Sequence, residues 1–411
     1  MPHQDSKRMT VSRRGFVAAA AAMGTAGIAL AAQQESAKAA ADGKFRLLCA
    51  PVLTNPAPDA VTVLWATSDM ATGWVEYGET ESLGQVARGM DQGLMPYERR
   101  YMKIRVGGLK PGTRYYYRVC SEHTTYDWHQ GIARDHDGAA RSELASFVTP
   151  NPNAAETTFT VWNDTHENVE TLKAVHAAHQ QSPGDFMLWN GDISNDLYDE
   201  PKIVDQFLNP AGLPFAANVP FYFVRGNHDA RGPFARLLNR VTDVPDGQFY
   251  YTFRHGPMAA IVLDTGEDKP DDHPVYADMG DFAAFRSLQT EWLAEAITRP
   301  EFRDAPFRVL FCHIPLWWTN DEHTGTYCLD GQRKWHQLLV DAGVQLVISG
   351  HTHQATHLPA DNRHPYIQLT GGGPRPDTAT YMRGHATADQ LTIMHHKLDG
   401  SVVHEIRVNA S

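Results

Sequence analysis

Five short apolar segments in the second half of the chain each end in a polar cluster, and this pattern constrains the fold more than any other feature. The segments span residues 157–162, 185–189, 220–224, 308–312 and 344–348. Their β-branched and aromatic residues are typical of buried strands. Helical periods lie between them, and the spacing of Val169, Leu172 and Val175 is one example. Strands that alternate with helices indicate a layered α/β domain.

The polar clusters contain the residue types that bind metal ions. They are Asp164-Thr165-His166, Gly191-Asp192-Ile193-Ser194-Asn195-Asp196, Gly226-Asn227-His228-Asp229, His313 and Gly350-His351-Thr352-His353. Ligand sites in open α/β sheets form beyond the carboxyl ends of strands, so we expect these loops to converge on one crevice. Two neighbouring divalent cations need imidazole and oxygen donors and a carboxylate able to bridge them. The predicted ligands are Asp164, His166, Asp192, Asn227, His313, His351 and His353.

Together these motifs resemble the calcineurin-like metallophosphoesterase family over roughly residues 155 to 411. The resemblance implies that Asp164, His166 and His353 bind a first metal ion. It implies that Asn227, His313 and His351 bind a second, with Asp192 bridging both. The cofactors would be two divalent metal ions, either manganese, zinc or iron. The implied fold is a two-sheet β-sandwich flanked by helices, which we adopt in place of a single doubly wound sheet.

The N-terminal region has a different pattern, that of short strands separated by turns. Val61, Val63 and Trp65 alternate with Thr62 and Leu64, which predicts a strand with one clearly apolar face. The segment Leu109–Tyr117 resembles the signature of fibronectin type III sandwiches, in which a tyrosine pins a corner. We therefore expect an all-β fibronectin-like sandwich at residues 42–152 and the α/β domain at 153–411. This order of domains extends the resemblance to purple acid phosphatases.

The first residues form a predicted export signal at 1–41. Four basic residues precede an Ala/Gly-rich apolar stretch, and small residues follow it. The segment Ser12–Val17 resembles the twin-arginine motif, which is read by the export machinery for folded proteins and is not a membrane anchor. The expected location is periplasmic or extracellular, after cleavage of the signal, with no stable membrane anchor.

The net charge argues against a nucleic-acid-binding protein, and the cysteine count argues against a disulfide scaffold but leaves one disulfide open. The formal net charge is −12 and the sequence has no basic run, so a nucleic-acid partner is not expected. Four cysteines are too few for a disulfide scaffold in a chain of 411 residues. Cys49 and Cys120 lie in the same N-terminal region and could pair, which the sequence does not decide.

The expected reaction is hydrolysis of small phosphate monoesters by a hydroxide held between the two metal ions. His228 lies beside the predicted ligand Asn227 and is our candidate acid or phosphate clamp. Many family members orient this histidine with an aspartate three residues after the bridging one. Here that position is Asn195, with Asp196 next to it. His323 follows His313 at a spacing similar to that of a substrate-contacting histidine in purple acid phosphatases.

Two other functions remain open at this point. The first is a phosphodiesterase that acts on small diesters or lipid headgroups, because the same metal site serves both reactions. The second is a catalytically silent binding module that keeps its metal ions. A binding module would have no need of His228 beside Asn227, so the sequence favours an enzyme.

Overall fold

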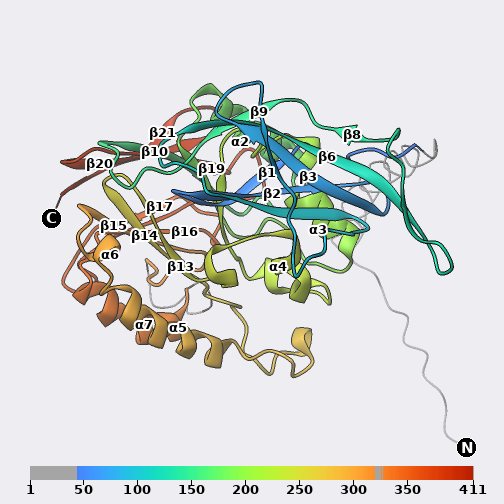
Figure 1. Cartoon of the computed structure of the whole chain (residues 1–411). Helices are drawn as coiled ribbons and strands as arrows, with labels where there is room; N and C mark the ends of the chain where they lie inside the picture. Colours follow the sequence, from blue (N-terminus) through green and yellow to red (C-terminus); the bar gives the residue numbers. More distant parts are fainter. Residues whose placement is uncertain (1–43, 320–324, 326, 411) are drawn as a thin grey trace, which may run out of the picture. The chain divides into compact units, whose positions relative to one another are not determined.

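Three β-sheets organise the part of the chain that the structure describes. This computed structural model describes residues 44–319, 325 and 327–410, and the predicted signal at 1–41 lies outside them. The chain from Leu47 onward forms one compact unit. Within it, helices α5 (Phe282–Ala296) and α7 (Leu329–Asp341) pack side by side (Figure 1).

The largest sheet has nine strands drawn from three separate parts of the chain. Their spatial order is β21 (Val402–Asn409), β20 (Gln390–Lys397), β19 (Thr380–Ala386), β10 (Thr157–Trp162), β11 (Phe186–Asn190), β12 (Phe221–Val224), β1 (Val52–Ala57), β2 (Ala60–Ala66) and β5 (Tyr101–Gly107). Strands β10, β11 and β12 run parallel as neighbours, so their carboxyl ends share one edge. They agree within one residue with the predicted strands at 157–162, 185–189 and 220–224.

A second sheet packs against the first. Its strand order is β13 (Tyr251–His255), β14 (Met258–Leu263), β15 (Phe307–Cys312), β16 (Leu346–Ser349), β18 (Ile367–Thr370) and β17 (Thr356–Leu358). Met258 and Val262 of β14 join the core between the two sheets, whereas Ile261 and Leu263 join the core under α5 and α7. A strand with two apolar faces must pack against other elements on both sides, and β14 does so.

Helices cover the outer faces of the two sheets. Besides α5 and α7 they are α2 (Val169–Gln181), α3 (Glu200–Phe207), α4 (Leu238–Val241) and α6 (Pro300–Arg303), with short 3₁₀ turns η2 (Pro210–Gly212), η3 (His228–Ala230), η4 (Ala235–Leu237), η5 (Pro245–Gly247) and η6 (Pro274–Tyr276). Leu172 of α2 and Phe207 of α3 pack in the core of the large sheet, and Trp335 of α7 packs under the second sheet. The layers confirm the predicted two-sheet α/β fold.

The N-terminal β-rich region confirms the other half of the predicted fold, but it shares a sheet with the α/β part. Strand β1 pairs in parallel with β12 through Thr54 and Phe221, so β1, β2 and β5 extend the large sheet. This pairing covers the hydrogen-bonding edge that β12 would otherwise expose. The third sheet is formed by β4 (Gln85–Ala87), β3 (Ala71–Gly78), β6 (Arg114–Asp127) and β7 (Gly131–Arg134), with β8 (Ala140–Arg141) and β9 (Ala145–Val148) beside β6.

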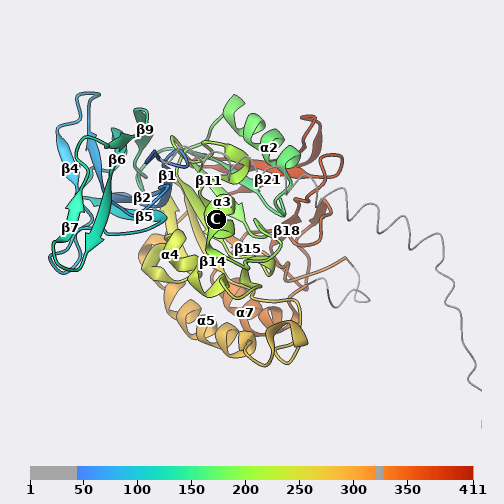
Figure 2. The ribbon, with the colours of Figure 1, turned by 90° about the vertical axis from the view of Figure 1, so that its right-hand side faces the viewer.

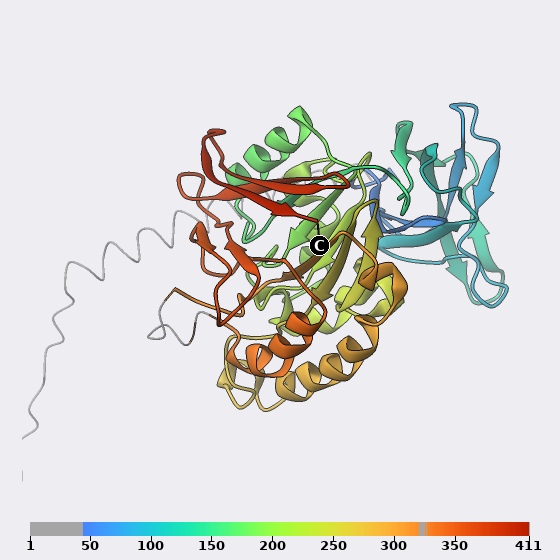
Figure 3. The ribbon, with the colours of Figure 1, turned by 90° about the vertical axis from the view of Figure 1, so that its left-hand side faces the viewer.

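Buried polar contacts join the third sheet to its neighbours. Trp65 of β2 donates a hydrogen bond from Nε1 to Ser121 Oγ at 2.9 Å. Tyr115 accepts one from the Lys110 backbone N–H at 3.1 Å and so ties the turn before β6 to that strand. Figures 2 and 3 show β4, β6 and β7 to one side of the two packed sheets.

The cysteine question left open by the sequence has a simple structural answer. Cys49 and Cys120 are both free thiols, and Cys49 Sγ accepts a hydrogen bond from the Ala66 backbone N–H at 3.2 Å. Within the described residues, no helix is both long and apolar enough to cross a membrane.

His255 should make the folded protein sensitive to acid. It is buried against Tyr222 and Phe186, and burial lowers its pKa to about 4. Because the unfolded chain takes up this proton near pH 6.5, stability is complete above that pH and is lost as the pH falls towards the folded pKa. From pH 7.5 to 4.5 the loss through this residue should be about 2 kcal/mol. Urea unfolding of His255→Gln should show a smaller fall than wild type over this range; equal falls would contradict the prediction.

Candidate metal centre

The predicted ligands lie in turns just after strand ends. Several of them have a left-handed backbone conformation, which few residues other than glycine adopt. Positive φ angles occur at Asp164 (55°), His166 (45°), Asp192 (53°), His351 (72°) and His353 (55°). Such left-handed residues cost on the order of 1–3 kcal/mol each and cluster at functional sites. Backbone bonds brace them, because the N–H of Asp164 donates to the Gly191 carbonyl and that of His166 donates to the Asp192 carbonyl.

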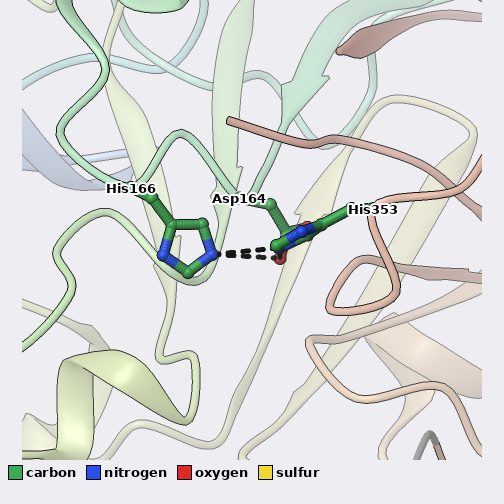
Figure 4. Close-up of side chains that lie close together, drawn as sticks. All are labelled: Asp164, His166 and His353. Carbon is green, nitrogen blue, oxygen red and sulfur yellow. Dashed lines mark hydrogen bonds and ion pairs between the residues drawn. The ribbon is translucent and has the colours of Figure 1, made fainter. Parts of the chain in front are cut away.

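Asp164, His166 and His353 bring their donor atoms together as one group (Figure 4). The two imidazole Nε2 atoms lie 3.1 Å apart, and His353 Nε2 lies 3.4 Å from Asp164 Oδ1. Donors that surround one ion tetrahedrally at about 2.1 Å lie roughly 3.4 Å from one another. The spacing therefore fits a shared cation.

Asp192, His313 and His351 form a second group. His313 Nδ1 donates to the Asn190 carbonyl at 2.7 Å, which fixes the tautomer and aims Nε2 at Asp192 Oδ2, 3.1 Å away. The amide of Asn227 adds an oxygen, since its Oδ1 lies 3.1 Å from His351 Nδ1. An amide oxygen, a carboxylate and two imidazoles suit manganese, zinc or ferrous iron.

Asp192 lies between the two groups. Its Oδ2 is 3.1 Å from His313 Nε2 in one group and 3.4 Å from His166 Nε2 in the other. The same carboxylate accepts the His228 backbone N–H through Oδ1 at 2.9 Å. It is thus the carboxylate placed to bridge two ions, although which atoms bind metal stays a prediction.

The buried carboxylates of the two donor groups also favour a positive charge beside them. Burial lowers the pKa of His313, but Asp192 and Asp164 raise it more, and it reaches about 10. Burial and the neighbouring His313 lower the pKa of His351 to about 4. Positive charge is favoured where His313 faces the two buried carboxylates, and there a divalent cation would replace the proton.

His228 lies at the edge of this centre. Its ring is 4.7 Å from that of His166, and it forms a third donor group with His166 and Asp192. Nδ1 donates to the Asn195 carbonyl at 2.7 Å, so a backbone group, not an aspartate, orients the ring. Asp196, the candidate from the sequence, instead pairs with Lys202 at 3.1 Å.

Sequence reasoning missed three residues around the centre. Asn195 Oδ1 accepts a hydrogen bond from His166 Nδ1 at 3.1 Å. Arg231 lies against His228, and the buried Glu267 holds both Arg231 and the Asn227 amide. Glu267 follows β14 with no metal-site motif around it, so only the folded structure could find it. His323, the predicted substrate contact, lies outside the described residues.

The substitution Gly226→Ala tests whether the donor groups bind metal ions. A Cβ there would lie 2.2 Å from Asp192 Oδ1 and 2.3 Å from its backbone N, so Gly226→Ala must displace the bridging carboxylate. We expect wild type to retain about two metal ions per chain, as a bridged site requires, and the variant to lose most of them. Elemental analysis after reconstitution would measure this. Gly107→Ala, which meets no atom within 4 Å, is the control; full metal content in both variants would refute the assignment.

Comparisons with known proteins agree with this geometry. Residues 157–355 match the calcineurin-like phosphoesterase family, and residues 50–132 match the purple acid phosphatase N-terminal domain. Acid phosphatase type 7 of Danio rerio is 25% identical over 72% of this chain and 67% of its own length. The serine/threonine-protein phosphatase CPPED1 of Pongo abelii is 24% identical over 45% of this chain, which spans 58% of that relative.

A solved structure shares the fold. The purple acid phosphatase PPD1 from yellow lupin (Lupinus luteus) seeds aligns with a TM-score of 0.64 at 15% identity, covering 87% of this chain and 74% of that one. The chain therefore contains a calcineurin-like phosphoesterase domain preceded by a purple acid phosphatase N-terminal domain, which together make up a metal-dependent phosphoester hydrolase.

Proposed function

We propose that this protein is an exported phosphomonoesterase that uses two divalent metal ions. The observation that carries the proposal is the pair of donor groups, because Asp192 of one group lies 3.4 Å from His166 of the other. The names of its relatives, an acid phosphatase and a protein phosphatase, support monoesters as the substrate class. The net charge of −12 favours a small phosphate ester over a nucleic acid.

When bound, the two ions would activate a water molecule and offset charge on the phosphoryl oxygens. The chain's own residues position the ester and handle the leaving group. Asn195 accepts the Nδ1 proton of His228, which leaves Nε2 as the atom that exchanges a proton. In the neutral ring Nε2 accepts from Arg231 Nη1 at 2.9 Å. Once protonated, Nε2 would release this contact and donate to the leaving oxygen as the ester bond breaks.

His228→Ala separates this role from metal binding. The variant should keep its metal ions and lose turnover of alkyl phosphates by roughly two to four powers of ten. The loss should be smaller for nitrophenyl phosphate, whose leaving group needs little protonation. Steady-state kinetics on both ester types, with metal analysis of each sample, would measure this. An equal loss on both esters would argue against the acid role, and a loss of metal would make His228 a ligand.

A screen of mono- and diesters with the metal-loaded protein tests the function itself. Hydrolysis of monoesters with higher kcat/KM than diesters is the expected result. A preference for diesters would replace this proposal with the phosphodiesterase, and no hydrolysis of either class would indicate a binding module.

Export through the twin-arginine route is the second part of the proposal, supported by Arg13 and Arg14 ahead of the apolar stretch. Replacing both with lysine should keep the full-length chain in the cytoplasm of a bacterium that has this machinery. Cell fractionation would follow the protein, with Arg8→Lys as the control. Unchanged export of the double variant would contradict this route.

A further inference from the structure

Arg231 places a fixed positive charge beside the proposed acid. Its Nη1 lies 2.9 Å from His228 Nε2 and 3.2 Å from Nδ1. We propose that Arg231 is a substrate-binding residue whose Nη1 contacts a non-bridging phosphoryl oxygen and so favours monoesters over diesters. The inference rests on the proposed function of this site, and it names the residue that sets the ester class.

The guanidinium is anchored by carboxylates on one side and faces His228 on the other. Nε and Nη2 donate to the two carboxylate oxygens of Glu267 at 2.8 and 2.6 Å, and Nη2 also donates to Asp268 at 3.0 Å. These bonds leave Nη1 directed at His228. Nη1 carries two N–H donors, and the imidazole can accept only one of them. The second donor is available to a ligand at the edge of the metal centre.

Glu267 links the Arg231 guanidinium to the metal centre. Its side chain is fully buried, and Oε1 accepts from Asn227 Nδ2 at 3.4 Å as well as from Arg231. Tyr276 donates its hydroxyl proton to the other oxygen. A single carboxylate thus orients a proposed metal ligand and holds the guanidinium at a set distance from it. Such preorganised donors contribute most where charge develops in a transition state.

The charge of the substrate explains why this contact would select monoesters. A phosphate monoester carries close to two negative charges near neutral pH, because its second pKa is about 6, whereas a diester carries one. Asp164, Asp192 and Glu267 are buried carboxylates at the centre, and Asp268 pairs with Arg231 beside it. A dianion that approaches them gains more from a fixed guanidinium than a monoanion does.

A purely structural role is the competing explanation, since Arg231 also ties the turn after β12 to the loop after β14. The two roles differ in their effect on substrates. Arg231→Gln should lower kcat/KM for nitrophenyl phosphate by roughly 10²–10³, the typical effect of removing one charge-stabilising donor. It should lower kcat/KM for methyl nitrophenyl phosphate by less than about tenfold. Metal content and circular dichroism should stay at wild-type values.

Two further variants sharpen the test. Arg236→Gln removes an exposed arginine five residues along the same segment and should leave the monoester-to-diester ratio unchanged. Arg231→Lys keeps the charge and should recover part of the monoester rate, which covers the case in which Arg231→Gln folds poorly. Binding of inorganic phosphate, measured by calorimetry, should weaken at least about tenfold in Arg231→Gln and less in Arg231→Lys.

The outcomes separate the inference from the function on which it rests. If wild type hydrolyses neither ester, the proposed function is wrong. If wild type is a monoesterase but an Arg231 variant with wild-type metal content and circular dichroism loses both activities equally, or Arg231→Gln binds phosphate like wild type, Arg231 is structural and the inference is overturned. A wild type that prefers the diester would overturn it as well.

Discussion

Two buried carboxylates that face imidazoles are the constraint on which the rest of this structure depends. Asp164 and Asp192 are 0% and 1% exposed, and within the described part of the chain their ion-pair partners are histidines. Buried charge is costly unless it is paired or coordinates a metal ion. Divalent cations bound at this point would satisfy both carboxylates and leave the imidazoles neutral, as metal binding requires.

The sheets supply the rigid frame that places these groups. Asp164 and Asp192 follow the parallel neighbours β10 and β11, and His313 and His351 follow β15 and β16 of the facing sheet. The two sheets therefore contribute predicted ligands to one centre. The left-handed turns that aim the side chains persist because the surrounding backbone bonds hold them.

The sequence predicts the parts of this arrangement that local pattern encodes. Strand runs such as 157–162 and 308–312 and the polar residues that follow them need only short-range information. Three other features depend on long-range packing. These are the pairing of β1 with β12, the carbonyl of Asn195 behind His228, and Glu267 beneath Arg231. In each case the two partners are far apart in the sequence, and no motif of fixed spacing connects them, so the sequence could not predict the contact. The sequence left open which residue orients His228; in the structure Asp196 pairs with Lys202, and the Asn195 carbonyl holds His228.

Anomalous diffraction from crystals of the reconstituted protein, recorded at the manganese and zinc edges, tests the central claim most directly. The account predicts two peaks, both next to the Asp192 carboxylate. One should lie about 2.0–2.2 Å from donor atoms of Asp164, His166 and His353, and the other at that distance from Asn227, His313 and His351. A single peak, or peaks away from Asp192, would contradict the dinuclear centre.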